Sequence, residues 1–162
     1  MRYCILIILS LLPYVNTMAQ KRQTADSLNV AGWLNEARKQ SPSTCLPVFF
    51  AEKFLGRPYV AHTLEVNDRE QLVVNTRQLD CTTLVENVVA LTCAIKRGKG
   101  TYKDYLYYLY KIRYRKGRNI GYVSRLHYFS ERIDDNTEKG IVEEGQWPNP
   151  PFSGIQTVGL GY

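Results

Sequence analysis

A cysteine followed by two threonines opens the most regular helical pattern of the sequence. The motif is Leu79-Asp80-Cys81-Thr82-Thr83, and residues suited to a buried face recur after it, namely Leu84, Val85, Val88, Val89, Thr92 and Ile95. Amide groups in a first helical turn have no partner within the helix, so they stabilise a nearby thiolate. Because a thiolate attacks carbonyl carbon, Cys81 is a candidate nucleophile. The alternative is that Cys81 fills space beneath the helix as a small apolar residue.

The end of a helix does not by itself ionise a thiol at neutral pH. Half ionisation at pH 7 requires a thiol pKa to fall by about 1.5 from a reference near 8.5, a change of about 2 kcal/mol. A helix end contributes only about 0.3 to 1 kcal/mol. A working cysteine therefore needs an imidazole beside it. The chain has two histidines, of which only His127 follows Cys81, and His62 is interpreted as a surface or turn residue.

The number and spacing of the cysteines bear on redox state and metal binding. The chain has four cysteines, and Cys4 lies in the N-terminal apolar run, which leaves Cys45, Cys81 and Cys93. An odd number cannot be fully paired, so at least one thiol is free or intermolecular. We expect Cys93 to pack against a helix and Cys45 to be loosely exposed. No Cys-x-x-Cys or His-x-x-x-His spacing occurs, so we expect no metal site and no organic cofactor.

The first residues predict export. Residues 3–12 form an apolar run that is too short to cross a bilayer of about 30 Å. Thr17-Met18-Ala19 places small residues one and three positions before a cut ahead of Gln20, so residues 1–19 are predicted to be a secretory signal. The alternative is a buried N-terminal helix. No lipoprotein-type box precedes Cys4, so we expect no stable membrane anchor and a protein exported to the periplasm or cell surface.

Periodicity and end signals predict the elements that position these residues. Helices are predicted over residues 27–39, 46–55 and 82–96, and from residue 101 to a basic stretch at 111–118. Extended segments are predicted at 59–60, 71–75, 119–124 and 140–142, and a polar turn at 134–136. The predicted inward residues of the first helix are Leu28, Ala31, Leu34 and Ala37, and those of the fourth are Tyr105, Leu106, Leu109 and Ile112. Thr83-x-x-Glu86 has the spacing of a capping box, and Thr101 with Asp104 is another start signal.

Composition and charge exclude several classes of protein. With 44% hydrophobic and 22% charged residues, the 162-residue chain is typical of one packed globular domain and not of a disordered chain. The net charge is +6, and tyrosines and basic residues alternate over residues 102–118. Such a pattern can bind nucleic acid, but export argues against that partner. The remaining interpretations are a solvated basic helix end and attraction to anionic wall polymers or peptide carboxylates.

Four motifs in order give the sequence a family resemblance. They are Gly56-Arg57-Pro58-Tyr59-Val60, Glu70-Gln71-Leu72-Val73-Val74-Asn75, Leu79-Asp80-Cys81-Thr82-Thr83-Leu84-Val85-Glu86 and Ser124-Arg125-Leu126-His127-Tyr128-Phe129-Ser130-Glu131. Together they resemble the N-acetylmuramoyl-L-alanine amidase-like family, which is similar to NlpC-like and papain-like cysteine hydrolases of cell-wall peptides. The resemblance covers about residues 46–142. It implies an α+β protein of the NlpC-like/papain-like fold, with an N-terminal helical half and an incomplete antiparallel sheet.

The resemblance also implies roles for particular residues. Cys81 is the nucleophile at the helix start, and Tyr59 matches a tyrosine that leans over the cysteine and steadies the oxyanion or substrate. Arg125, His127 and Tyr128 fall in the second signature, which lines the substrate cleft. Two positions depart from the family: Arg132 stands where it usually has a tryptophan, and Leu84 where it usually has a phenylalanine. The family's His-Val-Gly segment is absent, so either His127 is the base or the base lies in sequence that this chain does not contain.

These expectations define the function to be tested. We expect residues 20–144 to be the N-terminal portion of an amidase-like domain that hydrolyses peptidoglycan or muropeptides, and the Gly/Pro-rich residues 145–162 to be a tail or non-native end. Truncation would leave the chain inactive or nearly so. The alternatives are a non-catalytic wall-binding module and a truncated gene product. The sequence does not indicate an oligomeric state.

Overall fold

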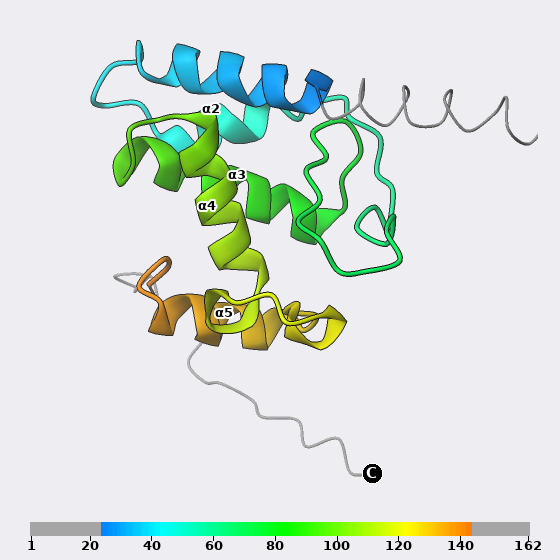
Figure 1. Ribbon diagram of the computed structural model, residues 1–162. Helices are drawn as coiled ribbons and strands as arrows, with labels where there is room; N and C mark the ends of the chain where they lie inside the picture. Colours follow the sequence, from blue (N-terminus) through cyan, green and yellow to red (C-terminus); the bar gives the residue numbers. More distant parts are fainter. Residues whose placement is uncertain (1–23, 144–162) are drawn as a thin grey trace, which may run out of the picture.

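A computed structural model of the chain describes residues 24–143 (Figure 1). The predicted signal at 1–19 and the tail at 145–162 lie outside the described residues. No helix among those described is long and apolar enough to cross a membrane. The elements in chain order are a helix over residues 24–37, α2 (Leu46–Glu52), α3 (Cys81–Lys96), α4 (Tyr102–Arg113), the short 3-10 helices η1 (Arg115–Gly117) and η2 (Tyr122–Ser124), and α5 (Phe129–Glu138).

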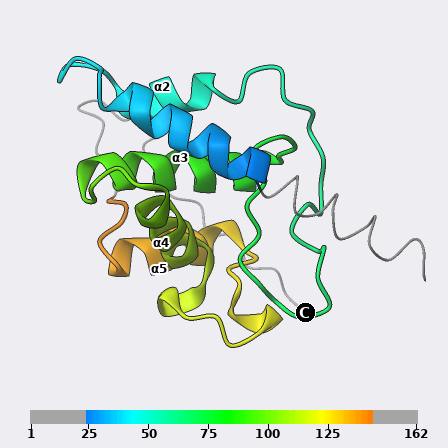
Figure 2. The same ribbon diagram turned by 45° about the horizontal axis from the view of Figure 1, so that its top comes forward.

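The helices stack in layers. In Figure 1 the helix over residues 24–37 and α2 lie at one end, α3 lies in the middle, and α4 runs from α3 toward α5 at the other end. Figure 2 shows the same order after rotation. The buried apolar core joins the first helix to α2, α3 and α4; its most buried members are Val30, Leu34, Phe50, Ala90, Leu91, Ala94, Tyr105 and Leu109. A single core therefore holds α3, the helix that carries Cys81.

The expected α+β fold with an antiparallel sheet is wrong for the described residues. They contain no strand, and their only ladder contacts are two isolated bridges, Tyr59 with Leu79 (parallel) and Tyr114 with Arg125 (antiparallel). Residues 71–75, 119–124 and 140–142 therefore do not pair as strands.

Side chains satisfy backbone groups that strands would otherwise bond to one another. The carbonyl of Val73 accepts a hydrogen bond from Arg113 Nη1 at 2.6 Å. The amide of Asn119 donates to Tyr110 Oη at 2.7 Å, and the amide of Ile120 donates to Ser124 Oγ at 3.1 Å. These backbone groups are therefore satisfied without a sheet. The extended segment predicted at 119–124 is also wrong at its end, because Tyr122–Ser124 form the 3-10 helix η2.

The helix ends follow the predicted caps with one correction. Thr101 caps α4 reciprocally with Asp104, as the sequence predicts. In α3 the capping box is formed by Asp80 and Thr83 instead of Thr83 and Glu86. Glu86 lies one turn further into the helix, where it is buried in an ion pair. An N-cap residue precedes the first turn of its helix. Asp80 does so, whereas Thr83 already lies within the first turn and cannot be the N-cap.

The buried faces of two helices are rotated from those predicted. In the first helix Val30, Trp33, Leu34 and Ala37 are buried, whereas Leu28 is 67% exposed. The buried side of α3 is Thr83, Glu86, Asn87, Ala90, Leu91, Thr92, Cys93 and Ala94, whereas Val85 is half exposed. Buried polar residues on these faces have partners. Asn87 Oδ1, for example, accepts from Tyr105 Oη at 2.5 Å. An apolar pattern alone does not reveal a face that includes paired polar groups.

The helix α5 replaces the polar turn predicted at 134–136. Asp135 and Asn136 are buried within it. Asn136 Nδ2 donates to the carbonyl of Ile112 at 3.1 Å, and Asp135 Oδ2 accepts from the amide of Lys116 at 2.7 Å. These two side chains tie α5 to the end of α4 and to η1, so polar contacts and not an apolar stripe dock this helix.

Candidate functional site

Cys81 is the first residue of α3, a 16-residue helix, and its thiol is free and exposed. The turn before it is fixed because Asp80 Oδ1 accepts from the amide of Thr83 at 2.7 Å, while the amide of Asp80 donates to Thr83 Oγ1 at 2.9 Å. The amides of Cys81 and Thr82 have no acceptor among the described residues. Two donors at the positive end of the helix therefore remain available beside an accessible thiol.

Tyr59 lies on a segment that runs alongside the residues before Cys81. The amide of Val60 donates to the carbonyl of Leu79 at 3.0 Å, and the amide of Leu79 donates to the carbonyl of Pro58 at 3.3 Å. The side chain of Tyr59 is 71% exposed. Because this bridge ends two residues before Cys81, the backbone places the tyrosine segment next to the start of α3, with both side chains open to solvent.

The other two described cysteines occupy different environments. Cys93 is buried, as expected, and burial raises the pKa of its thiol, against the smaller opposing effect of Arg97 and Lys96. Cys45 is exposed at the N-cap of α2, also as expected. The three cysteines between residues 24 and 143 are all free. Only Cys81 combines exposure with the start of a long helix.

His127 is exposed but forms no hydrogen bond with Cys81 in this structure. Its Nε2 lies 3.1 Å from the carbonyl oxygen of Tyr122, which only accepts, so Nε2 carries the proton in this contact. The imidazole also packs against the Tyr122 ring, with 4.5 Å between centroids. Within the described residues no cysteine-histidine pair is therefore assembled.

Arg125 is a buried connector, whereas Tyr128, three residues later in the chain, is exposed. Arg125 Nη2 donates to Glu65 Oε1 at 2.6 Å, and its Nε lies 3.9 Å from Glu70 Oε2. The guanidinium also stacks over the Tyr122 ring at 4.9 Å. Arg125 is only 4% exposed, whereas Tyr128, the N-cap of α5, is 70% exposed. Arg125 thus holds the histidine signature against residues 65–70.

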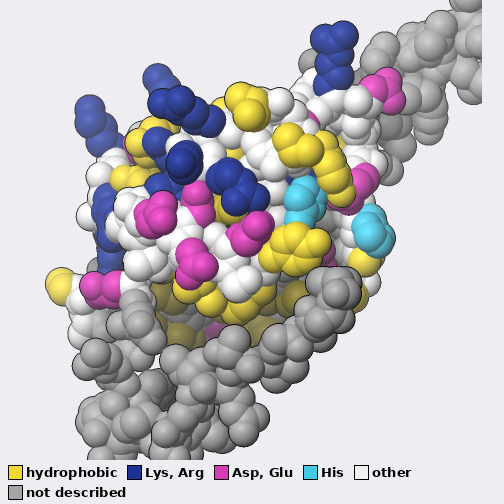
Figure 3. Space-filling view, turned by 90° about the horizontal axis from the view of Figure 1, so that it is seen from below, with side chains coloured by type: hydrophobic (Ala, Val, Ile, Leu, Met, Phe, Trp, Pro, Cys, Tyr) yellow, Lys and Arg dark blue, Asp and Glu magenta, His cyan; other side chains and the backbone are white. Residues whose placement is uncertain are grey.

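His62 belongs to the same face of the molecule as His127. It has a left-handed backbone (φ 59°) and is almost fully exposed, which agrees with its interpretation as a surface or turn residue. Its Nδ1 lies 3.9 Å from Glu65 Oε2, and Glu65 in turn bonds Arg125. Figure 3 shows the two histidine side chains near one another among hydrophobic side chains. Glu65 therefore links the segment after Tyr59 to the histidine signature.

A buried ionic cluster behind the candidate site was missed by the sequence analysis. Arg113 Nε and Nη2 lie 2.9 and 2.8 Å from Glu86 Oε2, and Arg132 Nη1 bonds Glu86 Oε1. Arg132 Nη2 also bonds the carbonyl of Leu126, the residue before His127. This cluster connects α3, α4 and α5 to the histidine signature. Its signal in the sequence was a lone glutamate among the apolar residues of α3.

Glu70, which lies near Arg125, is also held by a hydrogen bond from Tyr114. Tyr114 Oη donates to Glu70 Oε1 at 2.8 Å. Burial, and next this hydrogen bond, raise the pKa of Tyr114 far above its usual value. The tyrosine therefore stays a donor throughout the neutral range, and Glu70 lies between Tyr114 and Arg125. Among the described residues, no group of three or more histidine, cysteine and acidic side chains is arranged to hold a metal ion.

Two solved structures resemble this chain. One is named as a candidate xylanase from Bacteroides fragilis, with 40% identity and a TM-score of 0.54 over 58% of this chain and 41% of that chain. The other is an N-acetylmuramoyl-L-alanine amidase from Bacteroides uniformis, with 42% identity and a TM-score of 0.53 over 59% of this chain and 39% of that chain. The chain therefore spans about two-fifths of the length of either structure. A comparison with curated proteins gives no match.

The family match covers all of the candidate site. Residues 49–144 match the family described as N-acetylmuramoyl-L-alanine amidase-like (AmiA-like). This range contains Tyr59, Cys81, Arg125, His127 and Tyr128. It also spans α3, α4 and α5, the helices that the buried cluster of Glu86 holds together. Since the match extends over more than half of the sequence, the chain belongs to the N-acetylmuramoyl-L-alanine amidase-like family.

Proposed function

We propose that this chain carries the nucleophile of an exported hydrolase that cleaves an amide bond of peptidoglycan, with Cys81 as that nucleophile. The family match and the amidase of Bacteroides uniformis support the substrate class. The observation that carries the proposal is an exposed, free thiol at the first position of α3, beside two unbonded backbone amides. Export rests on the N-terminal residues 1–19, whose sequence is typical of a secretory signal.

The proposed reaction proceeds through a thioester. The Cys81 sulfur attacks the carbonyl carbon of the scissile amide, and the amides of Cys81 and Thr82 stabilise the oxyanion. The amide nitrogen takes a proton as the C–N bond breaks and leaves as an amine. Water then hydrolyses the thioester, which releases the acyl group as a carboxylic acid and restores the thiol. The exposed Tyr59 and Tyr128 are the proposed substrate contacts. Arg125 is a positioning residue, because it holds Tyr122, on which the ring of His127 packs.

The described residues do not place a proton-transferring base beside Cys81. A thiol hydrolase needs a base that accepts the proton of the cysteine and returns it to the leaving amine. His127 serves this role only if its ring leaves the carbonyl of Tyr122 and turns toward Cys81. The other source is sequence outside this chain, which spans about two-fifths of its structural relatives. We therefore expect the 162-residue chain by itself to be inactive or nearly so.

A non-catalytic wall-binding module is the second candidate. The absence of a hydrogen bond between Cys81 and either histidine of the described region favours it. A module of this kind retains the substrate contacts and lacks the proton transfer. It predicts binding of muropeptides that Cys81→Ser leaves unchanged, without hydrolysis in any longer relative.

Hydrolysis of purified muropeptides tests both candidates. The chain without residues 1–19 is compared with a longer relative that carries the same motifs, and products are separated by mass. We expect turnover by the longer relative only, and its loss when the cysteine that matches Cys81 becomes serine. A free L-alanine amine among the products identifies the bond next to the sugar-linked lactyl group. Turnover of xylan in place of muropeptides, or activity that survives the serine variant, contradicts the proposal.

A further inference from the structure

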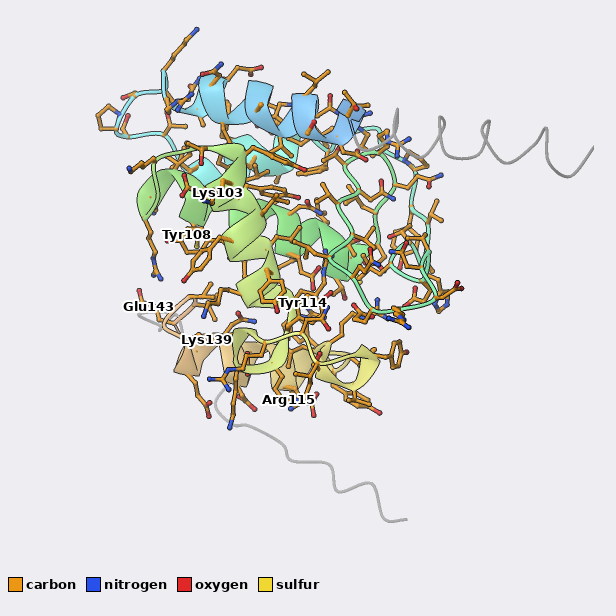
Figure 4. All side chains as sticks on the ribbon, in the orientation of Figure 1. Lys103, Tyr108, Tyr114, Arg115, Lys139 and Glu143 are labelled. Carbon is orange, nitrogen blue, oxygen red and sulfur yellow. The ribbon has the colours of Figure 1, made fainter. Side chains whose placement is uncertain are left out.

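A pocket opens on the molecule between α4 and the segment that follows α5. It has a volume of about 350 Å³ and is lined by Arg97, Tyr107, Tyr108, Lys111, Lys139 and Ile141. In Figure 4 Tyr108 on α4 and Lys139 after α5 lie on the same side of the molecule, with Glu143 nearby. The pocket is large enough for a small organic molecule.

This pocket is separate from the candidate nucleophile. Cys81 is the first residue of α3, and Arg97 follows its last residue. A helix rises 1.5 Å per residue, so the backbones at the two ends of this 16-residue helix are about 24 Å apart. A ligand in the pocket therefore does not touch the Cys81 thiol, and nothing in the proposed hydrolysis uses these residues.

The pocket has more positive charge than its own carboxylates balance. Lys139 pairs with Asp135 and also donates to the carbonyl of Lys111 at 2.5 Å. Arg97 Nη1 donates to the carbonyl of Gly140 at 2.5 Å, but no carboxylate of the described residues pairs with Arg97 or Lys111. Two full positive charges thus line the pocket without a partner of opposite sign.

The lysines of the pocket also affect one another. Burial lowers the pKa of Lys139, and the charges of Lys111 and Arg132 lower it further, against the opposing effect of Asp135. The ammonium of Lys111 lies 5.8 Å from the centre of the Tyr107 ring. An anion bound among these groups relieves their repulsion, so the field of the pocket favours a negatively charged ligand.

The remaining lining is aromatic and aliphatic. The rings of Tyr107 and Tyr108 meet edge to face with 5.1 Å between centroids, and Ile141 also lines the pocket. Burial raises the pKa of Tyr108, so its hydroxyl remains a donor at neutral pH. An inorganic ion leaves these rings uncovered, whereas an organic acid with a flat apolar part covers them.

We propose that the pocket binds a small organic carboxylate, whose carboxylate lies against Arg97 and Lys111 and whose apolar part lies against Tyr107 and Tyr108. The exposed Glu143 follows two residues after Ile141, and Figure 4 shows it near Lys139. Its charge weakens binding of an anion. The site is independent of hydrolysis, so its test does not depend on the role of Cys81.

The test is a titration of the isotopically labelled chain, without residues 1–19, followed by amide resonances. The probes are benzoate, the neutral benzamide of the same shape, and inorganic phosphate. We expect benzoate to shift the resonances of residues 107–111 and 139–141 in a saturable way, and to bind about threefold to tenfold more tightly than either benzamide or phosphate. Raising the salt concentration should weaken benzoate binding, because the cations are partly exposed.

Matched variants locate the charge that is responsible. Lys111→Met keeps most of the side-chain length and should weaken benzoate binding about threefold to tenfold, as should Arg97→Gln. Lys103→Met removes the same charge from the same helix, and in Figure 4 Lys103 lies nearer the opposite end of α4. It should leave the affinity within about twofold of the original chain. Glu143→Gln should tighten binding, and Cys81→Ala should not change it.

Several outcomes overturn this proposal. If benzamide binds as tightly as benzoate, the positive charges of the pocket do not contribute to the affinity. If phosphate binds as tightly as benzoate, the tyrosine rings do not contribute to it. Equal weakening by Lys103→Met and Lys111→Met means that net charge alone attracts the probe. The absence of saturable shifts in the original chain also overturns it. The muropeptide assay of the longer relative and of its serine variant has no bearing on these readouts, so the two proposals fail separately.

Discussion

At the scale of single residues, charged side chains hold the site segments in place. Glu86 is 1% exposed and bonds both Arg113 and Arg132. Arg132 stands where the family resemblance gives a tryptophan, and in this chain it anchors the carbonyl before His127. Burial of these charges is tolerated because every carboxylate oxygen of Glu86 has a guanidinium partner. The buried carboxylate of Glu86 therefore helps to position the histidine signature, together with the contacts of Arg125 with Glu65 and Glu70.

Replacement of Glu86 by glutamine should destabilise the fold strongly. It leaves the guanidinium groups of Arg113 and Arg132 buried without a countercharge, a loss of about 3 to 5 kcal/mol in the free energy of unfolding. Urea denaturation measures this quantity. Glu52→Gln is the matched control, because Glu52 is exposed at the end of α2 and should change stability by less than about 0.5 kcal/mol. Equal stability of the two variants contradicts the role of the cluster.

The three described thiols should differ in their rates of alkylation. In the folded chain we expect Cys81 to react fastest, because it is exposed at the start of a long helix. Cys45 is exposed at the start of α2, which has only 7 residues against the 16 of α3, so its thiol should react more slowly. Cys93 is buried with a raised pKa, so it should react last. Timed alkylation with iodoacetamide and peptide mass mapping measures the order. Labelling of Cys45 at the rate of Cys81 argues against a nucleophile at this place.

At the scale of elements, reciprocal caps set where α3 and α4 begin. Asp80 and Thr83 fix the turn that presents Cys81, and Thr101 and Asp104 fix the start of α4. Both pairs satisfy amides that the helix itself leaves without acceptors. The carboxylate of Asp80 also brings negative charge to the same end of α3 as the thiol. The cap therefore fixes the turn that presents Cys81. The negative charge of its carboxylate also partly cancels the positive charge of the helix end that stabilises a thiolate.

The cap of α4 should make stability depend on pH in the acid range. Hydrogen bonds from Thr101, its side chain first, lower the pKa of Asp104 below its usual value. A carboxyl with a lowered folded pKa stabilises the fold above its unfolded pKa near 4, and this contribution is lost as pH falls through the folded pKa. In urea denaturation Asp104→Asn should be less stable than the original chain at neutral pH. The gap should narrow at about pH 3, and a constant gap contradicts the assignment.

At the scale of the whole molecule, one core couples the site to the rest of the chain. Leu109 on α4 and Leu91 on α3 are fully buried in the same cluster as Val30 of the first helix. Apolar burial of this kind is the main favourable term in folding. The segments that carry Tyr59 and His127 have few ladder contacts of their own. Their placement therefore depends on this core and on the ionic contacts that extend from it.

Truncation of a core leucine should lower stability across the whole molecule. Leu109→Ala should reduce the free energy of unfolding by about 2 to 5 kcal/mol, because it removes buried methyl groups and leaves a cavity. Leu55→Ala makes the same change where the side chain is 78% exposed, so it should cost much less. Circular dichroism during urea denaturation measures both. Two separate transitions in the original chain contradict a single core.

The sequence by itself determined the long helices and the position of the thiol. The pattern after Cys81 and the cap at Thr101 predict α3 and α4, because caps and apolar periodicity are local properties of the chain. The exposure of Cys45, the burial of Cys93 and the surface position of His62 also followed from local context. The order of the motifs was sufficient to indicate the family that residues 49–144 match.

Tertiary structure decided what depends on partners distant in the chain. The segment at 71–75 has the composition of a strand, but the carbonyl of Val73 accepts a hydrogen bond from Arg113, which is 40 residues away. The helix α5 forms over a polar sequence because Asp135 and Asn136 bond backbone groups of η1 and of the end of α4. A side chain that replaces a backbone partner leaves no periodic trace in sequence, since its bond depends on the three-dimensional meeting of remote residues.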